Sequence, residues 1–376
     1  MLEVKSLPKK ILLIVLLIAT IASTIKLFKV IDGFDFQWSP AVLFWEGINP
    51  YEYFIEGNKN NRILPVQWPN YAHLTYIVLY PFTLFHSYQT VNIIWGLTNF
   101  CLAILSVIIL CRHCNLFFRD TLIILFIFLC STPFRLTIYG GQFSLVVLIC
   151  FTSFIIKKEY LSNLLLGFSY MKYSFAPPLF FFILFKRGFK AALLSTLVCV
   201  LGWIAFSLFL DINPFKTLLQ PLKVNLVNIP WPGAADVMSI VRMIFSNNSA
   251  ISQIFFYGVP LFLSVLFSWY TARTSGSKSF QLSIISIACL VTFRHAPYDF
   301  VLLLPAFIYA YKYRNMFEAK IAIIVILFNW FGIRALGLSY TLLWQEYANL
   351  FVICNFLINI FLAVIIVIIN KKNLKK

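Results

Sequence analysis

The sequence predicts an all-α fold, a polytopic bundle of about 10–13 transmembrane helices with about twelve as the preferred number. Of its 376 residues, 61% are hydrophobic and only 11% are charged, and the mean hydropathy is +0.87. Soluble domains carry roughly a quarter charged residues, so the composition excludes a soluble globular protein. The hydrophobic residues form blocks of about 20, which is the length that crosses the hydrocarbon core of a bilayer.

The expected helices follow these blocks in order along the chain, which we expect to form a single membrane domain, 1–376. In the N-terminal half they lie near residues 9–31, 72–87, 90–111, 120–138, 142–156 and 161–186. In the C-terminal half they lie near residues 189–210, 250–271, 279–293, 298–311, 318–333 and 350–370. The loops expected on the outer side are 32–70, 211–249, 294–298 and 334–349.

Lysine and arginine side chains gather at the ends of the hydrophobic blocks and give a formal net charge of +17. This placement is the positive-inside pattern, which puts 186–190, 271–278, 312–320 and both termini in the cytoplasm. The pattern indicates the lipid bilayer as the partner of the basic residues and argues against nucleic acid.

One stretch of the N-terminal half conflicts with simple alternation across the membrane. If every block crosses once, Arg119 and Lys158 face the outside, against the positive-inside rule. Placing them inside requires 72–87 to be re-entrant and 161–186 to split near Lys172.

The acidic residues are concentrated in the first outer loop, 32–70. Of the 13 carboxylates, five lie there: Asp32, Asp35, Glu46, Glu52 and Glu56. The aromatic residues among them favour interfacial helices in this loop. One interpretation is a solvated loop with an aromatic belt. The other is catalytic, because an aspartate at the headgroup level could take a proton from a hydroxyl group of a substrate.

The ordered motifs of the chain resemble those of glycosyltransferase family 87, of the GT-C superfamily of membrane glycosyltransferases. The first outer loop carries Asp35-Phe36-Gln37-Trp38 and Gly47-Ile48-Asn49-Pro50-Tyr51. The later motifs are Trp68-Pro69, Tyr80-Pro81-Phe82, Gly141-Gln142, Leu166-Gly167 to Lys172, Pro177-Pro178, Pro297-Tyr298-Asp299-Phe300 and Leu303-Leu304-Pro305-Ala306. The chain departs from the family pattern where Lys172 is followed by Tyr173 rather than by proline.

The resemblance implies an inverting transferase that uses a polyprenyl-phosphate sugar, a hexose such as mannose, on the outer face of a bacterial inner membrane. The acceptor it implies is a lipid-linked or other envelope glycan. Asp35 matches the aspartate that the family uses as general base, and Asp32 is the nearest substitute.

Several further residues are candidates for substrate contacts. A cation in the middle of a hydrophobic block is costly, so Lys172 is a candidate ligand of the donor phosphate, as are Arg294 and His295. His295 is equally well explained as an ordinary residue at a helix end. Candidate contacts to the substrates are Gln142, Tyr298, Asp299, Trp38 and Tyr51. For Gln142, a polar start of a helix is an equal explanation.

No cofactor is indicated by the sequence, which has neither a Walker nor a Rossmann glycine pattern. A divalent metal ion could bind Asp32, Asp35 and Glu46 through oxygen, but no Asp-x-Asp pair indicates one.

Two other classes of protein share this composition. A secondary transporter or a lipid or glycan flippase is the main alternative, although transporters place charges at mid-membrane in repeated halves and no repeat is visible here. A glycan polymerase or ligase would use arginines in a large outer loop, and 211–249 contains only Arg242.

Overall fold

The computed structural model describes residues 14–15, 17–22, 24–25, 33, 36–56, 67–156, 158–227, 235–245 and 250–375, with only the backbone described at 225–227, 250–252 and 333–348. Asp32 and Asp35 fall outside these residues, as do parts of the first expected helix and of both large outer loops. All regular secondary structure in the described residues is helical, which confirms the all-α class.

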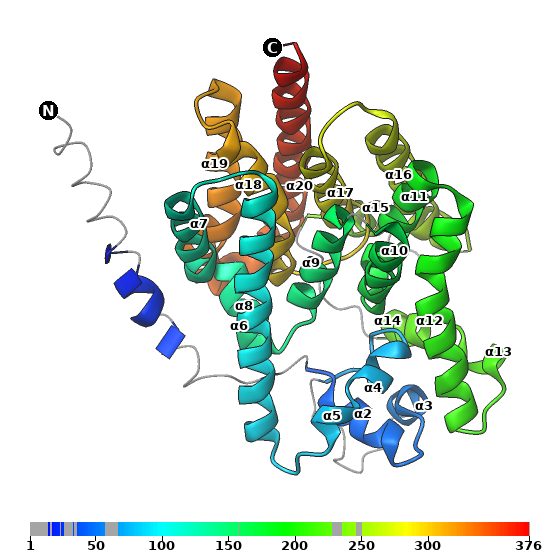
Figure 1. Cartoon of the computed structure of the whole chain (residues 1–376). Coiled ribbons are helices and arrows are strands. Elements are labelled where there is room, and N and C mark those ends of the chain that lie inside the picture. The colour runs from blue at the N-terminus through cyan, green and yellow to red at the C-terminus, as the bar shows by residue number, and fades with distance from the viewer. Residues whose placement is uncertain are drawn as a thin grey trace, which may run out of the picture.

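The helices carry the labels of Figure 1, in which the chain runs from blue to red. The first half contains α2 (Trp38–Trp45), α3 (Pro50–Ile55), α4 (Leu74–Val78), α5 (Tyr80–Thr83), α6 (Tyr88–His113), α7 (Phe118–Cys130), α8 (Thr132–Gly140), α9 (Ser144–Thr152), α10 (Glu159–Phe168) and α11 (Ala176–Arg187). The second half contains α12 (Phe189–Phe209), α13 (Pro214–Thr217), α14 (Gln220–Val227), α15 (Val237–Ile244), α16 (Ala250–Arg273), α17 (Lys278–Thr292), α18 (Leu304–Lys312), α19 (Phe317–Leu327) and α20 (Ile333–Leu374). A 3-10 helix, Pro297–Leu303, leads into α18.

Four helical segments of the described residues are long and apolar enough to cross a membrane: Tyr88–His113, Phe189–Phe209, Gln253–Arg273 and Asn349–Leu374. The pair α7 and α8 passes the same test together but is bent by 57° at Ser131. The apolar composition therefore makes the chain a membrane protein, while the preferred count of twelve spans is not confirmed. Residues 334–349, expected to be a loop, are helical and lie within α20.

The basic helix ends lie together at one end of the molecule, which we call the basic end. There Asp120 at the start of α7 pairs with Arg314 after α18, and Lys372 of α20 pairs with Glu318 of α19. At the same end Asn370 of α20 donates a hydrogen bond to the carbonyl of Ser275, before α17 (2.7 Å). Figure 1 shows these helix ends at the top and α2 to α5 at the bottom.

Three segments enter the molecule from the basic end and return to it. Residues 118–156 have Asp120, which accepts a hydrogen bond from Tyr311, near their start and Phe154, whose carbonyl accepts one from Arg187, near their end. Residues 159–187 double back so that Arg187 also binds Ser162. Residues 278–312 fold α17 against α18, with the Phe280 and Tyr309 rings 6.0 Å apart. We call these segments the three hairpins.

The hairpins bear on the two departures from simple alternation that the positive charges of the N-terminal half require. The split of 161–186 at Lys172 is confirmed, because α10 ends at Phe168 and α11 begins at Ala176. The block 72–87 contains only α4 and α5, which have five and four residues and are too short to cross.

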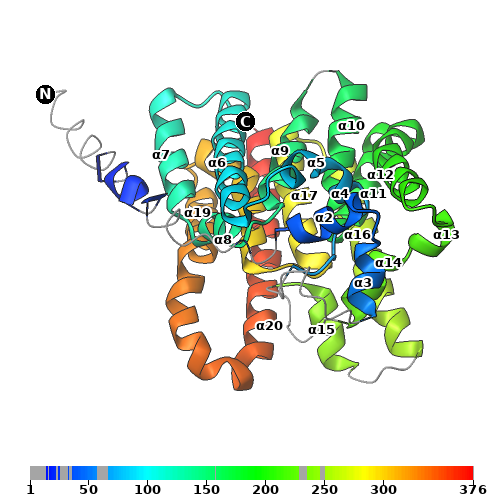
Figure 2. The ribbon, with the colours of Figure 1, turned by 90° about the horizontal axis from the view of Figure 1, so that it is seen from below.

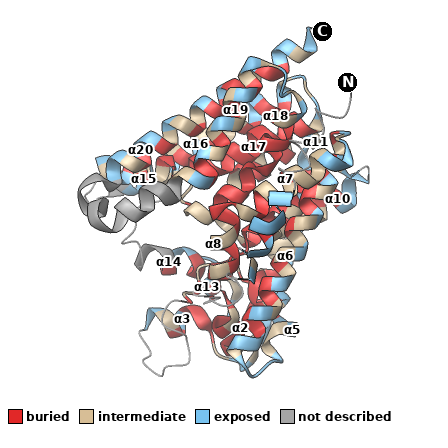
Figure 3. Ribbon diagram, turned by 90° about the vertical axis from the view of Figure 1, so that its left-hand side faces the viewer, coloured by how far each residue is buried: buried red, intermediate tan, exposed pale blue. Residues whose placement is uncertain are grey.

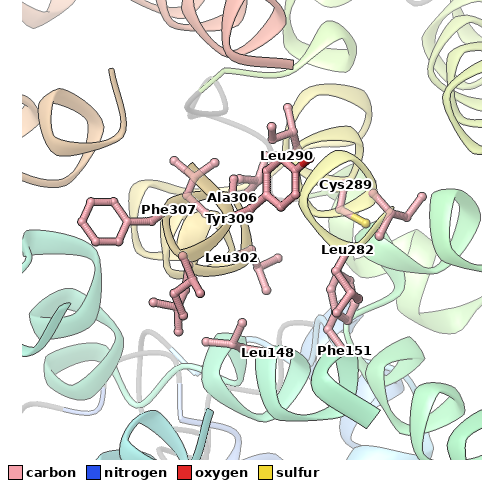
Figure 4. Packing of buried hydrophobic residues seen from close by; sticks show 14 of the residues in the cluster. Leu148, Phe151, Leu282, Cys289, Leu290, Leu302, Ala306, Phe307 and Tyr309 are labelled. Atoms are coloured by element: carbon pink, nitrogen blue, oxygen red, sulfur yellow. The ribbon is translucent and has the colours of Figure 1, made fainter. Parts of the chain in front are cut away.

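The core of the hairpin region is centred on α17, all of whose residues from Ser279 to Thr292 are buried. Figure 4 shows side chains of α17, α9 and α18 in one hydrophobic core, among them Leu282 and Cys289 of α17, Leu148 and Phe151 of α9 and Ala306 of α18. In Figure 3 this central region is red, whereas the outward faces of α6 and α16 are tan or pale blue. A helix that is apolar on every side is buried on every side, as α17 is.

The lower layer, α2 to α5, has a separate hydrophobic cluster built mainly from aromatic side chains. Phe36 stacks on Trp95 with ring centroids 5.0 Å apart, and Phe44 stacks on Phe206 at 4.8 Å. Phe36, Phe44 and Tyr51 are at most 1% exposed, so these rings form a protein core rather than an aromatic belt against lipid. Figure 2 shows α2 to α5 lying across this end of the bundle.

Residues 211–249, the second of the expected outer loops and called the second outer loop below, are attached to the lower layer by polar contacts. His73 Nε2 lies 3.0 Å from the carbonyl oxygen of Thr217 in α13, and Asn49 donates a hydrogen bond to Gln220 at the start of α14 (3.2 Å). Gln220 in turn donates to Glu52 of α3 (2.8 Å). Burial lowers the pKa of His73 to about 4, so its imidazole is neutral near pH 7 and Nε2–H can donate to this carbonyl.

Close packing of α10 against α12 gives a test of the hairpin arrangement. A Cβ atom at Gly167 of α10 would lie 2.2 Å from the Ser195 carbonyl oxygen of α12, so we expect Gly167→Ala to lower the unfolding temperature in detergent by several degrees. Gly258→Ala in α16, where a Cβ meets nothing within 4 Å, is the matched control and should leave this temperature unchanged or raise it. Equal unfolding temperatures for both variants would contradict the packing.

Candidate functional site

The turns of the three hairpins meet and bring together a set of polar side chains that we call the polar cluster. Ser144 begins α9 after the turn of the first hairpin, Lys172 lies at the turn of the second, and Asp299 follows the turn of the third. Asp236, just before α15, joins them from the second outer loop. The members of the polar cluster are Ser144, Lys172, Asp236, Arg294, His295 and Asp299.

Lys172 is held at this position by a break in the helical backbone. The residues between α10 and α11 form two short 3-10 turns, and Lys172 lies between them with φ −95° and ψ 83°. Pro177 and Pro178 fall in the first turn of α11, where proline is tolerated because the backbone N–H has no helical partner. The proline pair therefore prevents one continuous helix and leaves Lys172 at the turn.

The ammonium group of Lys172 forms an ion pair with Asp299 Oδ1 and donates to Ser144 Oγ at 3.3 Å. Ser144 also donates to Asp299 Oδ1. The same ammonium group lies 4.7 Å from the ring centre of Tyr298 and 5.2 Å from that of Phe175, within cation–π range. The Lys172 side chain is 12% exposed and that of Asp299 is 0% exposed, so this ion pair is shielded from water.

Asp299 has a second structural task, because it also caps the 3-10 helix in which it lies. Its Oδ2 accepts a hydrogen bond from the backbone N–H of Ala296 (3.1 Å). One carboxylate thus fixes the turn of the third hairpin and joins it to the other two through Lys172 and Ser144.

Asp236 and His295 form a second buried pair in the polar cluster. His295 Nδ1 lies 3.8 Å from Asp236 Oδ2, and both side chains are 0% exposed. Asp236 Oδ1 caps α15 by accepting from the Ser239 N–H (2.7 Å), whereas neither Asp236 Oδ2 nor His295 Nε2 has a hydrogen-bond partner among the described residues. Two unsatisfied buried polar atoms in one place indicate a site for a ligand or water.

Burial dominates the protonation of this pair. It raises the pKa of the Asp236 carboxyl above its ordinary value, an effect that His295 and the Ser239 N–H oppose. It lowers the pKa of the His295 imidazole, which the carboxylates of Asp236 and Asp299 oppose. An anion placed beside His295 would therefore favour its protonated form.

Arg294 is a cation of the polar cluster that has no ion pair within 4.0 Å in the described part of the chain. Burial lowers the pKa of its guanidinium group, and Asp236 and Tyr298 oppose this. The pKa of arginine starts so high that the group remains charged, and its fork of N–H donors matches the oxygens of phosphate. Arg294 is thus available to an anionic substrate.

The lower layer contacts the hairpin turns directly. The backbone N–H of Ala72 donates to the carbonyl of Met171, next to Lys172 (3.0 Å). Gln142, two residues before Ser144, accepts a hydrogen bond from the Tyr71 hydroxyl (3.1 Å), and the Tyr71 carbonyl accepts one from the Tyr51 hydroxyl (2.7 Å). The predicted substrate contacts Tyr51 and Gln142 therefore lie in one hydrogen-bonded chain that leads to the polar cluster.

The described neighbours of the predicted base are also fixed against a hairpin turn. The N–H of Gly33 donates to the Tyr139 carbonyl (2.8 Å), and the Gly33 carbonyl accepts from the N–H of Phe36 (2.9 Å). A Cβ atom at Gly141, whose φ is +69°, would lie 2.5 Å from Phe36 Cβ. Close approach of Phe36 to this turn thus requires glycine there.

The structure brings together five of the residues singled out from the sequence: Lys172, Arg294, His295, Tyr298 and Asp299. Gln142 and Tyr51 are linked to each other through Tyr71, and Gln142 lies two residues before Ser144 in the chain, whereas Trp38 donates to the Phe82 carbonyl within the lower layer (3.1 Å). Asp32 and Asp35 lie outside the described residues. In the described part of the chain, no three His, Cys, Asp or Glu side chains are close enough to hold a metal ion.

The family of the chain follows from a comparison with known protein families. The sequence model of glycosyltransferase family 87 matches residues 70–305, well over half of the 376 residues. The chain belongs to glycosyltransferase family 87. No curated protein and no solved structure matches it.

The match confirms the family that the motifs resemble and makes the protein a glycosyltransferase enzyme, which decides against the transporter and flippase alternatives. All members of the polar cluster lie within the matched residues, while the first outer loop with Asp35 precedes them.

Two members of the polar cluster of this glycosyltransferase were not selected from the sequence. Asp236 stands out afterwards as one of few carboxylates in the second outer loop, three residues before Ser239 in the pattern of a helix N-cap. Ser144 gives no such signal, because a serine at the start of an apolar helix is common.

The ion pair of the polar cluster predicts a measurable loss of folding stability when either Lys172 or Asp299 is replaced alone. We expect Asp299→Asn to lower the free energy of unfolding by about 3 kcal/mol, because it leaves Lys172 without its anion in a buried place. The double variant Lys172→Gln/Asp299→Asn should recover part of this loss. Thermal unfolding of the detergent-solubilised protein measures both.

The matched control is the exposed pair at the basic end, where the Arg314 side chain is 43% exposed. Arg314→Gln should cost less than about 1 kcal/mol. The loss of unfolding free energy in the double variant is compared with the sum of the losses in Lys172→Gln and Asp299→Asn. If the two were equal, Lys172 and Asp299 would not act as a pair.

Proposed function

We propose that this glycosyltransferase moves a hexose, such as mannose, from a polyprenyl-phosphate donor to a lipid-linked or other envelope glycan. The observation that carries the proposal is the buried polar cluster, in which the cations Lys172 and Arg294 and the protonatable His295 converge on hairpin turns that touch the first outer loop. A buried group of cations is suited to an anionic substrate, and the sugar phosphate is the anionic part of such a donor.

The donor phosphate binds at Lys172, Arg294 and His295 in this proposal. A sugar attached to polyprenyl phosphate carries a phosphodiester with about one negative charge, and the leaving phosphate gains nearly one more as the sugar departs. Cations fixed before the reaction stabilise that developing charge without reorganisation. The carboxylates of Asp299 and Asp236 keep these cations in place when no substrate is bound.

The acceptor hydroxyl is activated by Asp35 in a single inverting displacement. Asp35 takes the proton as the hydroxyl oxygen attacks the anomeric carbon, the bond from that carbon to the phosphate oxygen breaks, and polyprenyl phosphate leaves. Support comes from the neighbouring residue Phe36, which packs against Gly141 at the turn that carries Gln142 and Ser144. Gln142, with Tyr71, offers hydrogen bonds to sugar hydroxyl groups, and Tyr298 and Trp38 supply aromatic surface near them. Tyr51, which is buried in the core of the lower layer, holds Tyr71 in place through its hydroxyl group.

The basic end faces the cytoplasm, and the lower layer with the reaction faces the outside of a bacterial inner membrane. Support comes from the concentration of lysine and arginine at one end of the molecule, together with the positive-inside rule.

Transfer of labelled sugar tests the proposal. Membranes that contain the wild-type protein should transfer mannose from synthetic polyprenyl-phosphate mannose to lipid-linked acceptors, and Asp35→Asn should reduce the rate at least about a hundredfold because the base is lost. Asp32→Asn is the matched control and should retain activity. Full activity of both variants would remove Asp35 as the base, and absence of wild-type transfer from polyprenyl-phosphate hexoses would overturn the proposed donor.

The pair of Asp236 and His295 gives a second test, through the pH dependence of transfer. If protonated His295 binds the donor phosphate, kcat/KM falls as the pH rises through the pKa of His295. The Asp236 carboxylate raises this pKa, so Asp236→Asn should move the fall to lower pH, while its amide oxygen can still cap α15. Asp120→Asn, at the basic end, is the control. Identical pH profiles for Asp236→Asn and the wild type would exclude this role.

A further inference from the structure

Two cations at the basic end converge on one aromatic ring, at a place remote from the polar cluster. The guanidinium carbon of Arg187, at the end of α11, lies 4.6 Å from the centre of the Phe154 ring, and Lys278 Nζ, at the start of α17, lies 5.8 Å from it. Lys186, the residue before Arg187, adds a third cation nearby in the chain. We call Arg187 and Lys278 around Phe154, together with the adjacent residue Lys186, the basic site.

Within the described part of the chain, the cations of the basic site have only neutral hydrogen-bond partners. Arg187 donates to Ser162 (3.0 Å), Asn163 (2.5 Å) and the Phe154 carbonyl (3.2 Å). Lys278 and Lys186 each donate to a backbone carbonyl, at 3.4 Å. Glu159 attracts Arg187 and Lys278 from a longer range without forming an ion pair within 4.0 Å.

Two other cations at the basic end differ in this respect. Arg314 pairs with Asp120, and Lys372 pairs with Glu318. The basic site therefore carries positive charge that no ion pair within 4.0 Å neutralises among the described residues, although like charges held close together repel one another. An anion that both cations can reach would remove this repulsion.

The surroundings of the basic site favour a membrane lipid as the source of that anion. Exposed apolar and aromatic side chains lie beside it in the chain, Ile156 and Tyr160 before Ser162 and Phe189 after Arg187, and Phe189 is 70% exposed. Such side chains next to lysine and arginine are typical of the boundary between lipid headgroups and acyl chains. A phospholipid can place its phosphate on the cations and its acyl chains on these apolar side chains.

We propose that Arg187 and Lys278, flanked by Lys186, form a binding site for the phosphate of an anionic phospholipid headgroup. Phe154 holds the two cations side by side, and the ends of α10, α11 and α17 frame the site. The lipid would join the ends of the second and third hairpins, so its binding should stabilise the folded protein. This proposal does not depend on the sugar-transfer reaction.

Thermal unfolding of the purified, full-length protein in detergent tests the basic site. Phosphatidylglycerol added to the micelles should raise the unfolding temperature of the wild type in a saturable way, and phosphatidylcholine at the same concentration should not. Lys278→Gln should weaken the apparent affinity for phosphatidylglycerol about fivefold, and Arg187→Gln/Lys278→Gln should abolish the effect. Lys278 makes a single long hydrogen bond, so Lys278→Gln keeps the folded state even if the double variant does not.

The control variant is Lys372→Gln at the same end of the molecule, because that lysine is already paired with Glu318. It should respond to phosphatidylglycerol as the wild type does. An equal response of Lys278→Gln, or an equal loss in Lys372→Gln, would overturn the site and leave only general attraction to a negative surface. If inorganic phosphate raised the unfolding temperature as much as phosphatidylglycerol does, the proposal that the bound phosphate belongs to a lipid would be overturned.

Discussion

The ion pair between Lys172 and Asp299 is the interaction on which the arrangement of the hairpins depends. Both partners are removed from water, which costs several kcal/mol per charge unless each finds good partners. Here Ser144 and the Ala296 N–H satisfy the carboxylate, and two aromatic rings flank the ammonium group. Because the contributing residues come from all three hairpins, the pair is satisfied only when the three turns lie together.

That dependence explains why short helices suffice in the middle of this membrane protein. The 15 residues of α17 span only about 22 Å, less than the hydrocarbon thickness of a bilayer. Its far end lies at the turn before Pro297, where the backbone N–H and C=O groups need hydrogen-bond partners. Non-helical backbone at membrane depth is tolerated only where other groups of the protein form hydrogen bonds with it. The polar cluster and the lower layer, which contacts the hairpin turns, supply those groups. The polar cluster is shielded from water by these surrounding groups, and its charged side chains therefore suit a charged substrate.

The sequence predicted the features that follow from the free-energy cost of a buried charge or of proline within a helix. It missed those that depend on contacts between distant segments. A lysine inside an apolar block followed by two prolines had to lie at a break, and Lys172 does. Apolar composition could not separate a buried hairpin helix such as α17 from a lipid-facing span, because both are hydrophobic. Likewise the aromatic residues of the first outer loop suited an interface or a core equally, and Phe36 and Phe44 lie in a core. The pairing of Asp236 with His295 joins distant segments and leaves no local pattern.

The charges of the polar cluster nearly balance before any substrate binds, and this bears on how the site could favour transfer. Lys172 is paired with Asp299, while Arg294 and His295 lie near Asp236, so the attraction for a phosphodiester with one charge is moderate. When the sugar leaves, the phosphate gains charge and competes better with both carboxylates for the same cations. In this proposal a balanced site therefore gains more from the transition state than from the bound donor, which is the condition for catalysis rather than tight binding. A site with the cations alone would bind the donor and the product phosphate strongly and release the product slowly.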